Sequence, residues 1–259
     1  MHEHTDASTR KGGLDDENLA LIVMGDNTVL MTLEPDAVTT VTFDSYSTLV
    51  DVDAVESALE AHAAVDDPAP ISRTWRERSM QYTLVANHLD AYETFYELNR
   101  DALEYALAAH GVDCDADERE EILSVYHDLE VFDDVRESVE RLRSAGYDCY
   151  VLSNGNPEML ESMVEGAEID DLLEGTISAH ELETFKPAPE LYRHAAGRTG
   201  TPIGEIAHVS ALWFDVQGAV HAGMQGVWLD RKGDPKEPFG PDPDAVVEEL
   251  VELADVLGA

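Results

Sequence analysis

The chain of 259 residues is poor in basic side chains, and lysine is the scarcest of them. Lysine occurs only at positions 11, 186, 232 and 236, and 16 basic residues stand against 55 acidic ones, so the formal net charge is −39. A surface of that sign repels nucleic acids and anionic membranes, which excludes both as partners. Because like charges also repel one another within the protein, the compact state is expected to need screening by salt.

Two interpretations of this acidic excess are open. It could mark an acidic disordered segment, or it could reflect adaptation to a cytoplasm with molar salt, as in halophilic archaea. The acidic residues are spread over the whole length, among periodically spaced apolar residues, and are not gathered in one tail. This distribution favours halophilic adaptation.

Cysteines and long apolar runs are also scarce. Cys114 and Cys149 lie far apart with no partner pattern, which indicates neither a disulfide framework nor a zinc site. No run approaches the ~18 apolar residues of a membrane helix, and no secretion signal is recognisable. The sequence therefore predicts a soluble cytoplasmic protein whose length allows a core domain with a smaller inserted one.

The spacing of apolar residues predicts an α/β fold. A β-branched strand is expected at 38–43, followed over residues 53–129 by four helices near 53–65, 71–88, 91–110 and 116–128. Further strands are expected near 147–152, 175–178, 206–210 and 225–229, in alternation with helices near 133–144, 157–165, 188–198, 213–222 and 243–257. Such alternation predicts a doubly wound parallel sheet.

The same pattern suggests a division of the chain. The sheet and its helices would come from 36–52 and 130–259, and the four consecutive helices of 53–129 would form an inserted helical cap. An N-terminal extension, 1–35, contains a predicted β-hairpin around Gly25-Asp26-Asn27, and residues 1–17 are expected to be loose.

Functional groups in parallel sheets collect at the carboxyl ends of the strands, and this rule selects Asp44, Ser153 and Ser210. An Asp at the tip of a buried strand, followed by hydroxyl residues as in FDSYST, can be a carboxylate nucleophile, but it can equally be a helix N-cap. Ser153, within LSNGNP, is compatible with an anion-binding helix N-terminus or with a plain turn.

Two charged residues further along the chain could complete a site. Lys186, in FKPAPELY, precedes a helix that starts with proline, and in so lysine-poor a chain a fixed cation beside a carboxylate is favoured over a solvated lysine. Asp215 lies about one turn inside the helix after Ser210, where a residue that only complements the helix dipole is the alternative.

In their joint order, these four motifs resemble those of the haloacid dehalogenase superfamily over residues 36–259. The combination of an Asp, a Ser, a Lys and a Ser…Asp pair, each near a strand end, is specific to that superfamily. The resemblance implies a Rossmann-like core with an inserted cap, and it makes Asp44 the nucleophile.

Two positions decide between phosphorus and carbon as the atom attacked. Phosphatases of the superfamily usually carry an acid/base Asp two residues after the nucleophile and a magnesium-binding Asp directly after the fourth strand; here Tyr46 and Ala211 stand there. Without these carboxylates nothing protonates a leaving alkoxide, and a magnesium site is incomplete. The sequence thus looks like the L-2-haloacid dehalogenases.

The implied function is metal-independent hydrolysis of short 2-haloalkanoic acids to 2-hydroxy acids through an ester of Asp44, with no cofactor, because halide leaves without a proton. The alternatives are a Mg²⁺-dependent phosphatase that uses Asp44 and Asp215 as metal ligands, and a catalytically impaired or non-catalytic relative. Members of the family are often dimers, so a homodimer is one assembly that the resemblance implies.

The resemblance also assigns roles around Asp44. Lys186 would hold Asp44 ionised, while Thr48 and Ser153 would donate hydrogen bonds to Asp44 or to the substrate carboxylate. Three residues would orient Lys186 and the hydrolytic water: Tyr192, Ser210 and Asp215.

A second set would contact the substrate. Arg76, in the cap segment Trp75-Arg76, and Asn154 would receive the halide, and Tyr46 and Phe214 would form the apolar wall of the pocket.

Several residues depart from the family pattern, namely Ser45, Ser47, Glu77, Leu212 and Phe214. Family members usually carry Gly where Ser47 stands and Asn where Leu212 stands. That Asn is associated with positioning the hydrolytic water, and the side chain of Leu212 cannot form a hydrogen bond. Hydrolysis of the Asp44 ester is therefore the step that the sequence leaves open.

Overall fold

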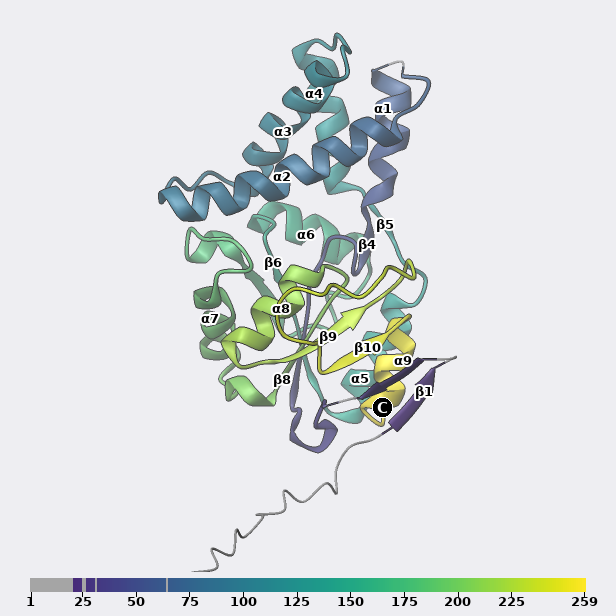
Figure 1. The fold of residues 1–259 in the computed structure, drawn as a ribbon, viewed down its shortest axis with the longest axis vertical. Helices are drawn as coiled ribbons and strands as arrows, with labels where there is room; N and C mark the ends of the chain where they lie inside the picture. The colour runs from purple at the N-terminus through teal and green to yellow at the C-terminus, as the bar shows by residue number, and fades with distance from the viewer. Residues whose placement is uncertain (1–20, 25–26, 31, 64) are drawn as a thin grey trace, which may run out of the picture.

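The structure, a computed structural model, describes residues 21–24, 27–30, 32–63 and 65–259. At its centre is a six-stranded, entirely parallel sheet with strand order β10-β9-β8-β3-β6-β7 (Figure 1). Its strands are β3 (Thr40–Phe43), β6 (Asp148–Ser153), β7 (Gly175–Ser178), β8 (Ile206–Ser210), β9 (Gln225–Leu229) and β10 (Ala245–Val247). The predicted α/β class and parallel sheet are confirmed.

The strand that leads to Asp44 is fully enclosed in the sheet. All four residues of β3 are buried, and β3 pairs with β6 on one side and β8 on the other. A central parallel strand is covered on both faces, which is why it carries a continuous run of β-branched and aromatic residues. Phe43 is in register with Val151 and Val209, so the residues that follow the three strands meet at one edge.

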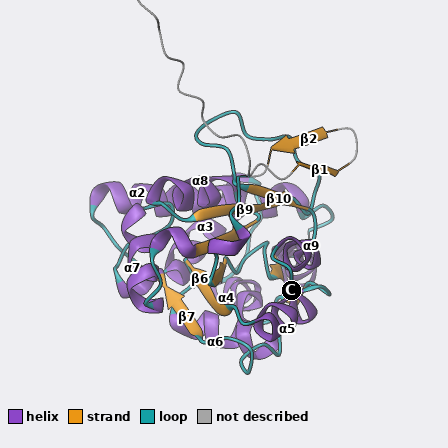
Figure 2. Ribbon diagram, turned by 90° about the horizontal axis from the view of Figure 1, so that it is seen from below, coloured by secondary structure: helices purple, strands orange, loops and turns teal. Residues whose placement is uncertain are grey.

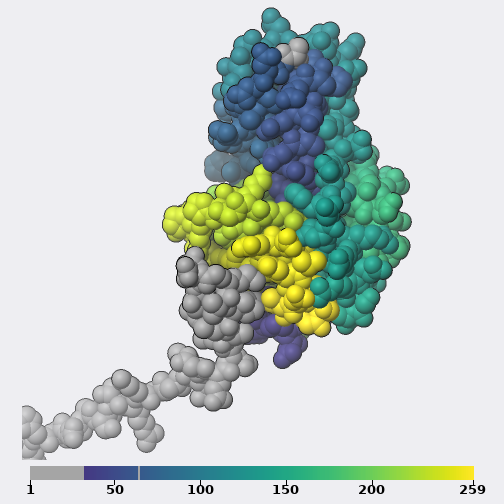
Figure 3. Space-filling model, turned by 90° about the vertical axis from the view of Figure 1, so that its right-hand side faces the viewer, coloured from purple at the N-terminus to yellow at the C-terminus, as the bar shows by residue number. Residues whose placement is uncertain are grey.

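Helices cover both faces of the sheet. In Figure 2 the strands lie between the pair α7 (Pro189–Thr199) and α8 (Trp213–Ala222) and the pair α5 (Val135–Ala145) and α9 (Leu250–Val256). Figure 3 shows α9, in yellow, beside the teal residues that include α5. Helix α6 (Pro157–Gly166) follows β6. These elements lie where the sequence predicts helices.

The last helix is an exception, because the sequence predicts a single helix over 243–257. The structure has β10 first and only then α9. Ala245 pairs with Val227, so the Ala-Val-Val run extends the sheet beyond β9. A short apolar run fits a buried strand and the start of a buried helix equally well, and only the neighbouring strand decides between them.

Four helices stand over the carboxyl edge of the sheet, as Figure 1 shows. They are α1 (Val55–His62), α2 (Ala69–Leu89), α3 (Phe95–Ala109) and α4 (Ala116–Ser124). Thr94 and Asp115 begin α3 and α4 with capping boxes, in which the side chain and a glutamate three residues on each satisfy a free backbone N–H group. Trp75 of α2 is fully buried and donates its indole hydrogen to the carbonyl of Asn99 at 2.8 Å, which joins α2 to α3.

A two-stranded ribbon connects these helices to the sheet. Strand β4 (Val50–Asp51) pairs antiparallel with β5 (Glu130–Val131), where the chain leaves the sheet and returns to it. Strands of two residues show no periodicity, so the sequence did not predict them. Among the described residues, no helix is long and apolar enough to cross a membrane.

Near the N-terminus, β1 (Leu21–Met24) and β2 (Asn27–Leu30) pair antiparallel, at the place of the predicted hairpin. The backbone N–H groups of Thr32 and Leu33 donate to the carbonyl of Asp244, just before β10. The turn at Gly25-Asp26, and residues 1–17 that are expected to be loose, lie outside the described residues.

Candidate active site

Three charged side chains meet at the carboxyl edge of the sheet. The Lys186 Nζ donates to Asp44 Oδ1 at 2.9 Å and to Asp215 Oδ2 at 2.8 Å. Asp44 directly follows β3, Lys186 lies in the loop after β7, and Asp215 lies in the first turn of α8. All three side chains are at most 5% exposed, so one ammonium serves two carboxylates away from solvent.

The two carboxylates are not equivalent. Burial raises the pKa of Asp44, and the Lys186 charge offsets that effect only in part. Burial also disfavours the charged form of Asp215, but Lys186 and His208 outweigh it and lower its pKa. Burial opposes the charged form of Lys186 as well, yet the two carboxylates raise its pKa. Asp44 is therefore the more basic of the two carboxylates.

Asp215 is held by a set of donors that leaves neither oxygen free. Tyr192 Oη donates to Oδ1 at 2.7 Å, while Lys186 and His208 Nε2, the latter at 3.1 Å, share Oδ2. Because a carboxylate only accepts, Nε2 of His208 carries the hydrogen. His208 Nδ1 lies 2.9 Å from Thr42 Oγ1 on the neighbouring strand.

His208 had no assigned role in the sequence, although a signal was present. It lies in the middle of β8, between the apolar residues Ala207 and Val209 of a sheet covered on both faces, and it is fully buried. A polar side chain in such a position must find a hydrogen-bond partner, so a histidine within a predicted buried strand itself indicates a buried polar contact.

The serines expected at Asp44 and Lys186 do not reach them in hydrogen-bond contact. Ser153 Oγ lies 2.6 Å from Ser45 Oγ and accepts from the Gly155 N–H at 3.0 Å. Ser210 Oγ accepts from the Leu212 N–H at 3.1 Å. Both hydroxyls satisfy a backbone donor two residues later, as serine commonly does where a strand ends in a turn. Both hydroxyls thus bind the turns that carry the site, and their expected roles toward the substrate carboxylate and the hydrolytic water stay predictions.

Thr48 behaves as expected. Its Oγ1 donates to Asp44 Oδ2 at 3.1 Å and accepts from the Ala211 N–H at 3.0 Å. The hydroxyl hydrogen is directed to Asp44, since a carboxylate oxygen only accepts. Both oxygens of Asp44 thus have a donor, one ammonium and one hydroxyl.

Asn154 and Arg76 lie in the site with partners of their own. Asn154 is buried, and its Oδ1 accepts from the backbone N–H of Lys186 at 2.9 Å, so it fixes the loop that carries the lysine. Arg76 Nη1 lies 2.7 Å from Asp53 Oδ1, and Asp53 also binds Lys232 Nζ at 2.9 Å. Arg76 contributes to the cleft wall, with its side chain 31% exposed.

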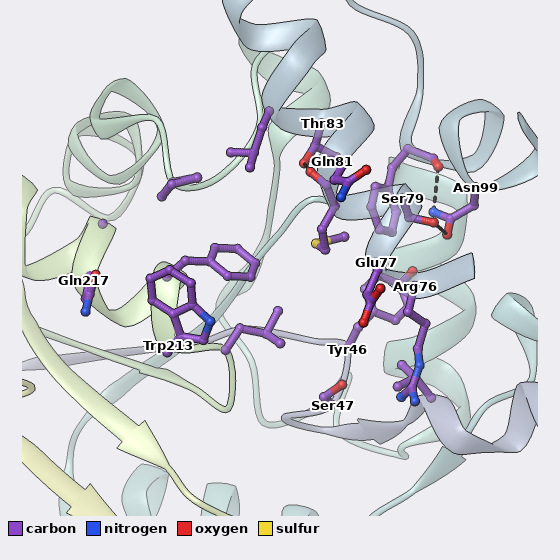
Figure 4. A pocket seen from close by; sticks show the side chains of 18 of the residues that line it. Tyr46, Ser47, Arg76, Glu77, Ser79, Gln81, Thr83, Asn99, Trp213 and Gln217 are labelled. Atoms are coloured by element: carbon purple, nitrogen blue, oxygen red, sulfur yellow. Dashed lines mark hydrogen bonds between the residues drawn. The ribbon is translucent and has the colours of Figure 1, made fainter. Parts of the chain in front are cut away.

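A cleft of about 910 Å³ opens between α2 and the edge of the sheet (Figure 4). Tyr46, Ser47 and Arg76 line one part of it, and Leu212, Trp213 and Phe214 line another. The expected wall residues Tyr46 and Phe214 are thus both at the cleft.

Tyr46 is packed as an apolar group. Its ring centroid lies 5.6 Å from that of Phe95 and 5.5 Å from that of Tyr126. Within the described part of the chain its hydroxyl has no hydrogen-bond partner, and burial raises its pKa well above that of an ordinary phenol. A Cβ on Gly155 would lie 3.0 Å from the Tyr46 hydroxyl, so a larger residue there would require the tyrosine to shift.

Two asparagines tie the cap helices to the loops of the site. Asn87 of α2 accepts from the Phe185 N–H at 2.9 Å and donates to the Phe185 carbonyl at 2.8 Å, beside Lys186. Asn156 Oδ1 accepts from the Tyr96 N–H of α3 at 3.1 Å. The sequence did not mark either residue, because amide side chains on a helix or in a turn are common.

Arg231 is a further residue that the sequence did not mark. Its guanidinium donates to the Thr48 carbonyl at 3.0 Å, pairs with Asp134 at 2.9 Å, and lies 4.1 Å from the centre of the Phe132 ring. It therefore joins the loop after Asp44 to the segment after β5.

The carboxylates do not fit a magnesium ion. The Lys186 ammonium lies between Asp44 and Asp215, and both oxygens of Asp215 already accept hydrogen bonds. Magnesium requires oxygen ligands in octahedral geometry, and the Lys186 ammonium, which contacts both carboxylates, would repel a second cation there. Within the described residues, no three His, Cys, Asp or Glu side chains are grouped so as to hold a metal.

Comparisons with known proteins identify the family. Residues 38–223 match the family model of the haloacid dehalogenase-like hydrolases. The chain is 32% identical over 204 residues to (S)-2-haloacid dehalogenase 4A of Burkholderia cepacia, an alignment that covers 78% of this chain and 87% of the relative.

Solved structures of dehalogenases are also similar to this chain. The crystal structure of a dehalogenase is similar with a TM-score of 0.82 and 31% identity, over 86% of this chain and 99% of that one. The L-2-haloacid dehalogenase from Xanthobacter autotrophicus with covalently bound chloropropionic acid is similar with a TM-score of 0.78 and 27% identity, over 86% and 99% of the two chains.

Proposed function

Because the chain belongs to the haloacid dehalogenase-like hydrolases, we propose that it hydrolyses the carbon–halogen bond of 2-haloalkanoic acids through an ester of Asp44, without a metal or other cofactor. The observation that carries the proposal is Tyr46. Two residues after the nucleophile stands a buried phenol with a raised pKa, so the leaving group must depart without receiving a proton there. A halide can leave without receiving a proton, whereas an alkoxide cannot.

The first step is a substitution at C2 of the substrate. A carboxylate oxygen of Asp44 attacks C2 from the side opposite the halogen; the O–C2 bond forms as the C2–halogen bond breaks, and its electron pair leaves with the halide. The raised pKa of Asp44 favours this step, because a more basic carboxylate is a better nucleophile. Arg76 and the amide nitrogen of Asn154 would receive the halide.

The second step is hydrolysis of the ester. Water attacks the carboxyl carbon of Asp44, the bond from that carbon to the oxygen bound to C2 breaks, and the 2-hydroxy acid leaves with that oxygen while the water oxygen restores the carboxylate. Lys186 and Thr48, which already contact the two carboxylate oxygens, are placed to stabilise the negative charge of the tetrahedral intermediate. Over both steps one water is consumed, and one halide and one proton are released.

The proposal includes the setting of the enzyme. We place the core at 36–52 and 130–259 and the cap at 53–129, as the strands β4 and β5 suggest. The net charge of −39 supports action in the salt-rich cytoplasm of a halophilic archaeon, with no nucleic acid or membrane as partner. The names of the relatives suggest (S)-substrates, and a homodimer is the assembly we propose.

The direct test is halide release without metal. The protein is incubated with (S)-2-bromopropionate in molar KCl with EDTA, and bromide and lactate are measured by chromatography, with Asp44→Asn as the control. We expect equal amounts of bromide and lactate, with inverted configuration at C2. Release no faster than with Asp44→Asn, or Mg²⁺-dependent hydrolysis of p-nitrophenyl phosphate instead, would refute the proposal.

A further inference from the structure

The cleft is much larger than a short 2-haloacid requires. A cavity of about 150 Å³ holds benzene, a molecule of six heavy atoms, and 2-chloropropionate also has six. The cleft measures about 910 Å³, near the upper end of the range usual for pockets that bind larger organic ligands. A three-carbon substrate would therefore leave most of it to water.

The remaining space is bordered by exposed apolar side chains. Leu84 of α2 is 51% exposed, Trp213 of α8 is 41% exposed and Phe239 is 70% exposed, and all three line this one cleft. Large apolar groups that gather on the surface of a protein usually mark a binding site. On a chain with a net charge of −39, their concentration in one cleft strengthens that conclusion.

These side chains form an ordered aromatic surface. The Trp213 ring lies edge-on to Phe214 at 5.7 Å and to Phe239 at 6.4 Å. Gln217, one turn after Trp213, donates to the backbone carbonyl of Phe239 and so fixes that loop against α8. Met80 and Leu84 of α2 also line the cleft.

The aromatic residues share their cleft with Tyr46 and Arg76 of the proposed substrate site, while Asp44 lies buried two residues before Tyr46. Figure 4 shows Trp213 and Gln217 on one side of the cleft, and Tyr46, Ser47 and Arg76 on the other. The cationic groups that line the cleft within the described residues, apart from His221, are Arg73 and Arg76, one turn apart on α2. A substrate with its carboxylate and halogen near Tyr46 would direct its C2 substituent toward Trp213.

We propose, on the basis of the proposed function, that the substrates of this enzyme carry a bulky apolar substituent on C2, such as a medium-length alkyl chain or a phenyl ring, and that Trp213 and Phe239 bind that substituent. Each methylene buried in the cleft should raise kcat/KM about three- to fourfold. The gain ends where the substituent passes Phe239 and reaches solvent.

The test is a substrate series, with kcat/KM measured for the 2-bromo derivatives of propionate, hexanoate, octanoate and phenylacetate. We expect kcat/KM to rise from propionate to octanoate, and Trp213→Ala or Phe239→Ala to reduce the octanoate-to-propionate ratio at least tenfold. Leu89→Ala, an exposed leucine of α2 outside the cleft, should leave that ratio unchanged. A ratio near one in the unmodified enzyme would overturn the proposal while leaving the dehalogenase function intact.

A binding measurement separates the two proposals. Octanoate and propionate, which carry no halogen, are titrated against the protein while Trp213 fluorescence is followed, with Trp213→Phe as the reference for the other tryptophans. Tighter binding of octanoate supports the assignment of the cleft even if no bromide is released, in which case only the chemistry fails. Equal binding of octanoate and propionate would overturn the assignment. It would also be overturned if sedimentation showed a dimer that Phe239→Ala dissociates without changing the affinity for octanoate.

Discussion

At the scale of single residues, the site depends on how one ammonium is divided between two buried carboxylates. Asp215 receives three donors, from Lys186, His208 and Tyr192, and Asp44 receives two, from Lys186 and Thr48. Since burial penalises both charges, the carboxylate with more donors is the better stabilised anion. The proposed nucleophile is thus the carboxylate whose charge the fold stabilises less.

This asymmetry predicts opposite effects of two isosteric substitutions. Because the pKa of Asp44 is raised, its contribution to stability is present at low pH and is lost as the pH rises through that pKa, so Asp44→Asn should keep or raise the melting temperature at neutral pH. Because the pKa of Asp215 is lowered, its contribution is present at neutral pH and is lost as the pH falls; Asp215→Asn should cost about 3–5 kcal/mol.

Thermal and urea unfolding of both variants at neutral pH, in the same salt, test the contrast. Both should be inactive, so activity does not distinguish them. Equal losses of stability would show that the two carboxylates share the ammonium evenly.

Ser47 adopts a backbone conformation that suits glycine. Its φ is +66°, in the left-handed region, where a residue with a Cβ is strained by about 1–2 kcal/mol. Glycine removes that strain but loses more entropy on folding, so Ser47→Gly should stabilise the protein by about 0.5–1 kcal/mol. Ser47→Ala keeps the Cβ and should give no gain; an equal gain from alanine would show that the hydroxyl, not the backbone, is unfavourable.

We expect Leu212 to affect the second step of the proposed reaction. It lines the cleft and offers no hydrogen bond to a water, so ester hydrolysis should be slow compared with its formation. We expect intact mass spectrometry of acid-quenched enzyme to show the Asp44 ester during turnover with 2-bromopropionate, and Leu212→Asn to reduce its fraction and raise kcat several-fold. A Leu212→Asn variant with an undiminished adduct would show that another group orients the water.

At the scale of elements, the site depends on how closely α8 approaches α7. A Cβ on Gly218 of α8 would lie 2.6 Å from Tyr192 Oη and 2.7 Å from Pro187 Cβ. Tyr192 holds Asp215, and Pro187 follows Lys186. The spacing of the two helices therefore sets the geometry of the charged cluster.

Gly218→Ala should accordingly separate the helices, with a cost of about 1–3 kcal/mol for overpacking and a reduced kcat. Gly197→Ala on α7 is the matched control, since Gly197 has open space around its Cβ position and lies within a helix. That control should stabilise the protein by about 0.5–1 kcal/mol. Similar stability losses for both variants would rule out the contact as the cause.

At the scale of the whole molecule, charge repulsion acts against folding. The 55 acidic and 16 basic residues give a net charge of −39, and most acidic groups are at the surface. The range of such interactions falls from about 10 Å at 0.1 M salt to about 3 Å at 1 M. The same screening would allow an anionic substrate to approach an acidic protein.

The melting temperature should therefore rise by at least ten degrees between 0.1 and 2 M KCl. Sucrose favours compact states by exclusion from the surface and does not screen charge, so it serves as the control and should give a smaller rise. A melting temperature that is unchanged by KCl would exclude self-repulsion as a main destabilising term.

The sequence by itself determined the order of elements, the strand ends that carry Asp44, Ser153 and Ser210, and the chemistry excluded by Tyr46 and Ala211. These properties follow from apolar periodicity and from residue type, both of which are local. Apolar periodicity could not predict the two-residue strands β4 and β5, which are too short to show a period. It also did not distinguish a strand from a helix in the short apolar run that forms β10.

Only the tertiary structure decided which side chains are hydrogen-bond and ion-pair partners within the site. Three sets of contacts depend on strands and helices that are neighbours in space but distant in the chain. They are those of Lys186 with Asp44 and Asp215, of Ser153 with Ser45, and of His208 with Asp215. A hydroxyl or carboxylate binds the donor that the packing brings nearest, and burial sets how strongly each charge is disfavoured. Neither quantity can be obtained from residue types and spacing.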